Sequence, residues 1–86
     1  MHATMCVGLL VRVKKEYAFF NGQPEFFTLY DDPDDLGSDL TGELDAKHVA
    51  IIVEGPYMNK YGHYMIKILG TTGLGWVQAT FLEVVP

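Results

Sequence analysis

Short runs in which apolar and polar residues alternate recur along the sequence, and this period-two pattern constrains the fold more than any other feature. Residues 63–68 alternate most regularly, and residues 7–13 do so too. Such alternation is typical of strands with one buried face. Further runs rich in β-branched and aromatic residues cover residues 26–30, 47–54, 74–79 and 83–85. The sequence therefore predicts an all-β fold.

Turn-forming residues separate these runs. Asn21-Gly22 follows a β-forming segment and predicts a hairpin, with residues 26–30 as the returning strand. Gly55-Pro56 is expected to end the strand at residues 47–54. Residues 31–45 are expected to form a long loop. Several short strands separated by turns indicate a small barrel or sandwich.

The composition fits one domain with one core, because the chain has 86 residues of which 49% are hydrophobic. Cys6 is the only cysteine, which excludes an intrachain disulfide and fits a reducing compartment. Residues 5–11 are apolar, but no basic residue precedes them, and the run is too short to span a bilayer. We therefore expect no signal peptide, no membrane partner and a cytoplasmic or otherwise intracellular location.

The acidic residues are concentrated in one segment. Residues 31–45 hold seven of the eleven Asp and Glu residues and no Lys or Arg, in a chain of net charge −5. Nucleic acid would be repelled by this segment, and no basic stripe exists elsewhere to attract it. We expect no nucleic-acid partner, and a protein or peptide partner that is basic.

Three motifs resemble those of Src homology 3 domains. Residues 28–32 read Thr-Leu-Tyr-Asp-Asp, residues 43–47 read Glu-Leu-Asp-Ala-Lys, and residues 75–82 read Gly-Trp-Val-Gln-Ala-Thr-Phe-Leu. In order and spacing they resemble Ala-Leu-Tyr-Asp-Tyr, Glu-Leu-Ser-Phe-Lys and Gly-Tyr-Ile-Pro-Ser-Asn-Tyr-Val of that family. The resemblance covers about residues 26–85. It implies a single domain, residues 1–86, in which residues 26–86 form a Src-homology-3-like barrel and residues 1–25 add an N-terminal strand and hairpin.

The same resemblance implies a partner-binding face whose proline-binding groove is mostly lost. Tyr30 and Phe81 keep the aromatic character of two groove positions. Asp32 replaces a second tyrosine, His63 stands near the position of a ligand-clamping tryptophan, and Gln78 replaces a proline. Proline stacking is therefore expected to be weak. Alternation from the inward Val77 adds Trp76, which gives six predicted partner-binding residues: Tyr30, Asp32, His63, Trp76, Gln78 and Phe81.

The acidic segment also matches part of a calcium-binding EF-hand loop. Asp32, Asp34, Gly37 and Glu43 occupy its first, third, sixth and twelfth positions. Leu36 occupies the fifth position, where an oxygen ligand is required, so we predict no tight calcium site. The only serine has no histidine nearby in sequence, and the three histidines lack metal-ligand spacing. We expect neither an enzyme nor a bound cofactor.

Two questions stay open at this level. Tyr57 and Trp76 are either exposed beside the acids or covered by the N-terminal hairpin. The function is a non-enzymatic protein- or peptide-interaction module, a structural or assembly subunit that self-associates through strand edges, or, more weakly, a cation-binding domain. In each case one shared core is predicted, comprising Leu29, Ile51, Ile66, Ile68, Val77, Ala79 and Leu82.

Overall fold

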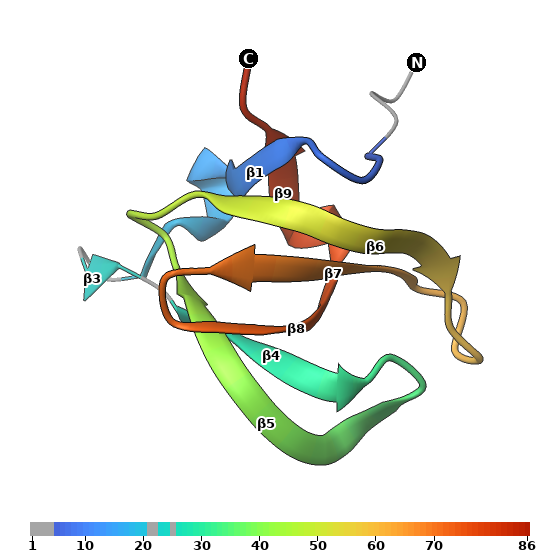
Figure 1. Ribbon diagram of the computed structural model, residues 1–86. Helices are drawn as coiled ribbons and strands as arrows, with labels where there is room; N and C mark the ends of the chain where they lie inside the picture. Colours follow the sequence, from blue (N-terminus) through green and yellow to red (C-terminus); the bar gives the residue numbers. More distant parts are fainter. Residues whose placement is uncertain (1–4, 21–22, 25) are drawn as a thin grey trace.

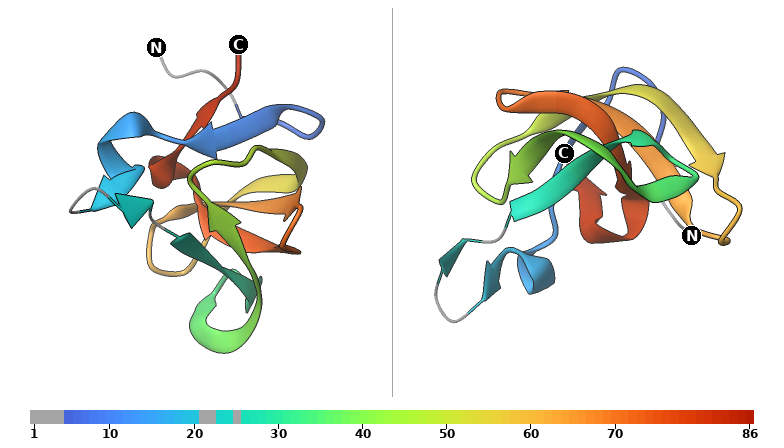
Figure 2. Two further views of the ribbon diagram at one scale, coloured as in Figure 1. Left: turned by 90° about the vertical axis from the view of Figure 1, so that its left-hand side faces the viewer. Right: turned by 90° about the horizontal axis from the view of Figure 1, so that it is seen from below.

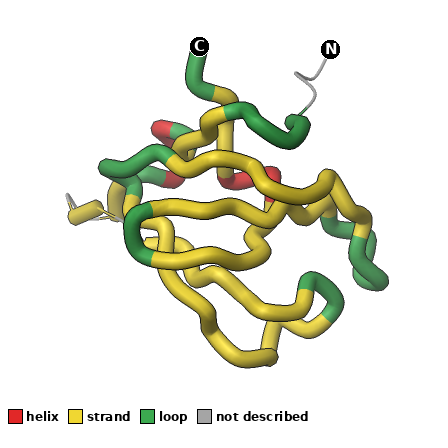
Figure 3. Tube along the Cα trace, in the orientation of Figure 1, coloured by secondary structure: helices red, strands yellow, loops and turns green. Residues whose placement is uncertain are grey.

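The computed structural model describes residues 5–20, 23–24 and 26–86 and contains strands joined by short connections (Figure 1). The strands are β1 (Leu10–Val13), β2 (Phe19–Phe20), β3 (Gln23–Pro24), β4 (Phe26–Asp32), β5 (Asp35–Asp45), β6 (Ala50–Met58), β7 (Tyr64–Gly70), β8 (Gly73–Gln78) and β9 (Leu82–Val84). Helix in this part of the chain is limited to two 3₁₀ turns, η1 (Lys15–Tyr17) and η2 (Ala79–Phe81), drawn red in Figure 3. No helix among these residues is long and apolar enough to cross a membrane. The all-β prediction is confirmed.

Seven strands form one antiparallel sheet in the order β4-β5-β8-β7-β6-β1-β9, with a further pairing between β4 and β8. The end strands β4 and β9 do not pair with each other, so the sheet is curved but open. The closed barrel that the sequence suggested is therefore not formed.

The first strand lies inside this sheet, between β6 and β9. Val11 and Val13 are buried in the main core, so β1 contributes to the core as well as to the sheet. Of the described strands, β2 and β3 form a separate hairpin, which stands apart from the sheet in Figure 2. The predicted turn at Asn21-Gly22 lies outside the described residues. The segment predicted to return from that turn instead pairs with β5.

The acidic segment is mostly strand, and the long loop predicted there is wrong. β5 pairs with β4 from Phe26 opposite Asp45 to Asp32 opposite Asp35. One buried face is enough to fix a hairpin, and Leu29 and Leu44 supply it with exposed fractions of 0% and 2%. The acids therefore belong to a hairpin, which we call the acidic hairpin (β4–β5).

The core lies on one face of the sheet. Its buried members are Val11, Val13, Ala18, Leu29, Leu44, Ala50, Ile52, Ile66, Ile68, Val77 and Leu82. Five of the seven predicted core residues are among them, and Ala79 packs against their edge. The placement of Ile51 in the core is wrong, because Ile52 pairs with buried Ile68 and adjacent strand residues point to opposite faces.

The acidic hairpin approaches the rest of the sheet most closely where β5 meets β8. Gly42 pairs with Gly73. A Cβ atom added to Gly42 would lie 2.7 Å from the Gly73 Cα and 2.7 Å from the Thr72 carbonyl oxygen. Two backbones can come this close only where side chains are absent. This contact sets the position of the hairpin relative to β8.

Candidate functional site

The face of the sheet opposite the core carries the candidate site. Lys67 pairs with Glu54 on one side and with Trp76 on the other, and Met65 pairs with Tyr57. Met65 and Lys67 are two residues apart on β7, so they point to the same face. Glu54, Tyr57 and Trp76 therefore share one face, which we call the outer face.

An irregularity in β6 brings Glu54 and Tyr57 to the same face. Residues three apart in a regular strand point to opposite faces, but the β6–β7 pairing shifts register on both sides of Glu54. Gly55 makes this possible with a φ of 100°, and a Cβ added there would lie 3.0 Å from the Met65 carbonyl oxygen. The prediction that Gly55-Pro56 ends the strand is thus wrong. The pair instead bends β6 and builds the site.

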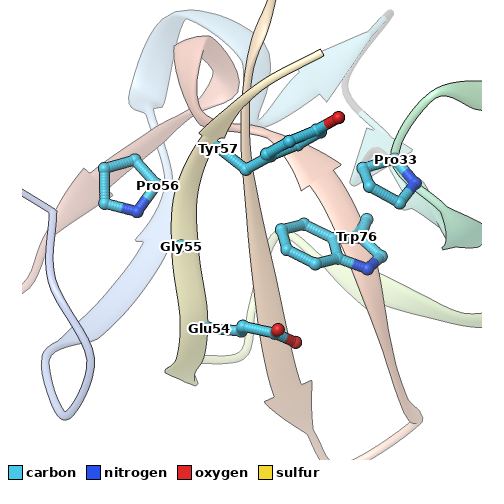
Figure 4. Close-up of a pocket in the computed structure, with 6 residues that line it drawn as sticks. All are labelled: Pro33, Glu54, Gly55, Pro56, Tyr57 and Trp76. Atoms are coloured by element: carbon cyan, nitrogen blue, oxygen red, sulfur yellow. The ribbon is translucent and has the colours of Figure 1, made fainter.

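An open hollow of about 400 Å³ lies on this face, lined by Pro33, Glu54, Gly55, Pro56, Tyr57 and Trp76. The rings of Tyr57 and Trp76 are 6.0 Å apart between centroids and inclined at 60°. Figure 4 shows both rings, with Pro33 and the Glu54 carboxylate, on the same side of β6. Trp76 is 8% exposed and Tyr57 is 41% exposed. None of the described residues before Pro33 lines the hollow.

Three hydrogen bonds tie the tip of the acidic hairpin to the rim of the hollow. The Tyr57 hydroxyl donates to Asp34 Oδ2 at 2.6 Å, and the Lys60 backbone N–H donates to Asp34 Oδ1 at 2.8 Å. The Asn59 side-chain amide donates to the Pro33 carbonyl oxygen at 3.1 Å. These bonds join segments 23 to 26 residues apart in the chain and hold Pro33 against the aromatic rings.

Asn59 organises the β6–β7 loop from within. Its side chain is only 4% exposed. Its Oδ1 accepts hydrogen bonds from the backbone N–H groups of Tyr61, at 3.0 Å, and His63, at 2.9 Å. A buried amide with its donor and acceptor both engaged fixes loop geometry, because breaking these bonds would leave buried polar groups unpaired. Sequence reasoning missed Asn59, since an asparagine in a turn gives no distinct functional signal.

The hydrogen bond between Asp34 and Tyr57 shifts the pKa of both side chains. The Tyr57 hydroxyl, the Lys60 N–H and the Lys60 charge together lower the pKa of Asp34 below its ordinary 3.8. The hydrogen bond to Asp34, then partial burial and the negative charges of Asp34 and Asp32, raise the pKa of Tyr57 above 10.0. The tip is therefore anionic, and Tyr57 keeps its proton, across the whole neutral range.

These shifts predict how the tip responds to pH. A lowered folded-state pKa means that ionised Asp34 stabilises the fold above about 3.8, and this contribution is lost as the pH falls through the lower folded value. We expect an NMR titration of the Asp34 carboxyl to give a midpoint below 3.8. Tyr57→Phe should move the midpoint upward, because the hydroxyl is the largest cause of the shift. An unchanged midpoint in Tyr57→Phe would show that the hydrogen bond is not formed in solution.

Two predicted site residues flank the hollow on the outer face. Tyr30 of β4 pairs directly with Trp76 of β8. Gln78 lies two residues beyond Trp76 on the same strand and so points to the same side. The structure therefore brings these three predicted residues together.

Asp32 and His63 lie nearby, in the two segments that the tip hydrogen bonds join. Asp32 is exposed, and its Oδ1 accepts the Asp34 backbone N–H at 2.9 Å. His63 is exposed at the end of the loop that Asn59 organises. Neither lines the hollow.

Phe81 belongs to a different group of rings. It stacks on Phe27 at 4.9 Å between centroids and meets Tyr17 edge-on at 5.2 Å. Phe81 does not line the hollow, whereas Pro33, Glu54 and Pro56, which the sequence did not single out, do. These three residues line the hollow because β6 bends and because the hairpin tip lies against it. Neither the bend nor the position of the tip produces a repeating pattern in the sequence.

The residues of the EF-hand match are not arranged as calcium ligands. Asp32 pairs with Asp35 at the hairpin tip, whereas Glu43 pairs with Thr28. The two pairs are four positions apart on β4, which places Glu43 roughly 13 Å along the strand from the tip. Among the described residues, no three His, Cys, Asp or Glu side chains could hold a metal ion together.

Comparison with known proteins gives no relative. No family model, no curated protein and no solved structure matches this chain.

Proposed function

We propose that this chain is a non-enzymatic protein-interaction module that binds a basic segment of a partner, with one Arg or Lys side chain in the hollow. The observation that carries the proposal is the hollow itself: two aromatic rings and a proline beside the Glu54 carboxylate, at the end of the molecule that holds the acidic hairpin tip. Apolar walls with a few placed polar groups are typical of recognition pockets.

The apolar stem and the charged end of an arginine or lysine side chain both match this lining. Its aliphatic stem can lie on the rings of Tyr57 and Trp76, and its charged end can reach Glu54. Glu54 now pairs with Lys67 at 3.8 Å, but its side chain is 61% exposed. A pair this exposed is weak, so a partner's cation can replace Lys67.

The acidic hairpin adds long-range attraction. Asp31, Asp32 and Asp35 are exposed at or next to the tip, and Asp34 is ionised at neutral pH. A cluster of charges of one sign accelerates the association of an oppositely charged partner, and salt screens this attraction. Binding should therefore weaken markedly as the salt concentration rises.

The proposal extends to the fold family: we infer a divergent Src-homology-3-like domain. A turn of 3₁₀ helix followed by a last strand, η2 and β9, supports it, because the family motif that residues 75–82 resemble forms such a turn and the last strand of the domain. The hairpin made by the other two motifs, β4 and β5, also supports it. Since Gln78 and Asp32 occupy groove positions, proline-rich peptides should bind with dissociation constants above about 1 mM.

Replacing Glu54 with glutamine tests the proposal. The probe is an eight-residue peptide of alternating arginine and glycine, and the signal is the emission of Trp76, the only tryptophan. We expect a dissociation constant of about 10 µM to 1 mM for the wild type. Glu54→Gln should weaken binding roughly 3- to 10-fold, because the charge-assisted contact is lost.

Glu43→Gln is the matched control, because it removes the same charge from an exposed residue that does not line the hollow. It should weaken binding less than about twofold. Equal losses in the two variants would mean that net charge alone attracts the peptide. An unchanged Trp76 emission at saturation, or equal binding of an alternating serine–glycine peptide, would also contradict the proposal.

A further inference from the structure

A row of exposed aliphatic side chains crosses four neighbouring strands of the outer face. Leu10 of β1 pairs with Ile51 of β6, Ile51 pairs with Leu69 of β7, and Leu69 pairs with Leu74 of β8. Their exposed fractions are 45%, 36%, 48% and 42%. We call these four residues the aliphatic row.

The row differs from the isolated exposed apolar residues of an ordinary surface, because each member is the direct cross-strand neighbour of the next. Contiguous exposed apolar surface marks sites of association. The end strand β9 has only three residues, so it offers little backbone for another strand to pair with. Association through the β9 edge is therefore less favoured than association through this face.

Beside the row lie two opposite charges, Lys67 two residues before Leu69 on β7 and Glu54 three residues after Ile51 on β6. Glu54 of β6 pairs with Lys67 of β7, and these strands also hold the two central members of the row, Ile51 and Leu69. The surface next to the row is thus negative on β6 and positive on β7. This arrangement is complementary to itself under a two-fold rotation.

We propose that a second copy of this chain packs face to face on the aliphatic row, about a two-fold axis that runs along the strands between β6 and β7. After this rotation, β6 of one copy lies opposite β7 of the other, and β1 lies opposite β8 of the other. Ile51 then lies opposite Leu69 of the second copy, and Leu10 lies opposite its Leu74. Two sheet faces pack in this way about 10 Å apart, with strand directions within about 30° of each other.

The charges beside the row agree with this arrangement. Glu54 of each copy lies opposite Lys67 of the other, so two attractive pairs lie beside the row, both on the same side of it. The tip of each acidic hairpin is bonded to Tyr57 of β6, so the rotation places both tips at the same end of the dimer, where the net charge of −5 per chain opposes association. The inference does not depend on the proposed function.

The row is small compared with the roughly 800 Å² per partner of a standard interface, so the dimer should be weak. Sedimentation velocity between about 5 µM and 1 mM should show a monomer converting to a dimer, with a dissociation constant of about 10 µM to 1 mM. Leu69→Lys should raise this constant at least 10-fold. Met58→Lys, at a position 51% exposed and outside the row, should leave it unchanged.

A charge-exchange experiment tests the axis itself. Glu54→Lys and Lys67→Glu should each be monomeric alone, because like charges then face one another across the axis. An equimolar mixture should form the heterodimer, since the lysine introduced into one chain would face the glutamate introduced into the other. The far-ultraviolet circular dichroism of each variant should match the wild type, because both positions are on the surface. A wild type that stays monomeric to 1 mM, or a mixture that stays monomeric, would overturn the inference.

Discussion

Replacing Gly42 with alanine is expected to destabilise the folded chain by about 3–5 kcal/mol. The new Cβ would lie 2.7 Å from the Gly73 Cα and from the Thr72 carbonyl oxygen, and both are backbone atoms. Backbone cannot rotate away as a side chain can, so β5 and β8 would have to separate. Overpacking of this kind costs about 1–3 kcal/mol, and the φ of 156° adds strain of similar size.

Gly62→Ala is the control for this measurement. Gly62 also has a positive φ, of 85°, but an added Cβ would meet nothing within 4 Å. The conformational strain alone should cost about 1–2 kcal/mol. Urea denaturation of both variants measures the difference. Equal losses would mean that β5 and β8 do not approach closely at Gly42.

The sequence correctly predicted those parts of the fold in which buried and exposed residues alternate regularly along a strand. Ile66, Ile68 and Val77 alternate with outward residues, and all three are buried on one face. Here a single periodic rule decides which side faces the core. The same rule cannot choose between the adjacent Ile51 and Ile52, because both are equally apolar. Only the pairing with β7 makes that choice.

The elements that were mispredicted depend on tertiary pairing. β5 contains seven residues that are Asp, Gly, Ser or Glu and reads as a loop, yet it is held by β4 along its length. β1 was predicted as a strand, but its partners β6 and β9 lie some 40 to 70 residues away and could not be named from the sequence. Local propensity gives no information about such partners.

The candidate site was predicted only in part, because some of its contacts also join distant segments of the chain. Trp76, Tyr30 and Gln78 follow from alternation and from the family resemblance, and they do lie on one face. Asp34 entered only as a calcium ligand, whereas it bonds to Tyr57 and Lys60. Its actual role depends on which loop the hairpin tip meets.

Replacing Ile66 with alanine is expected to cost about 2–5 kcal/mol, which is a large share of the roughly 5–10 kcal/mol available to a domain of this size. Ile66 is fully buried, pairs with Val77 and belongs to the main core. Truncation to alanine would remove three carbons and leave a cavity that the closely packed strands cannot fill. Denaturation by urea, read by Trp76 emission, measures the loss.

Ile51→Ala makes the comparison decisive, because it removes the same three carbons from the neighbouring strand. Ile51 is 36% exposed on the outer face, so no closed cavity forms there. Its loss should be below about 1.5 kcal/mol at a protein concentration of a few micromolar, where the proposed dimer is dissociated. A cost for Ile51→Ala equal to that of Ile66→Ala would mean that the two faces of the sheet are assigned the wrong way round. The core, the outer face and the hollow depend on that assignment together, because all three follow from the register of β6, β7 and β8.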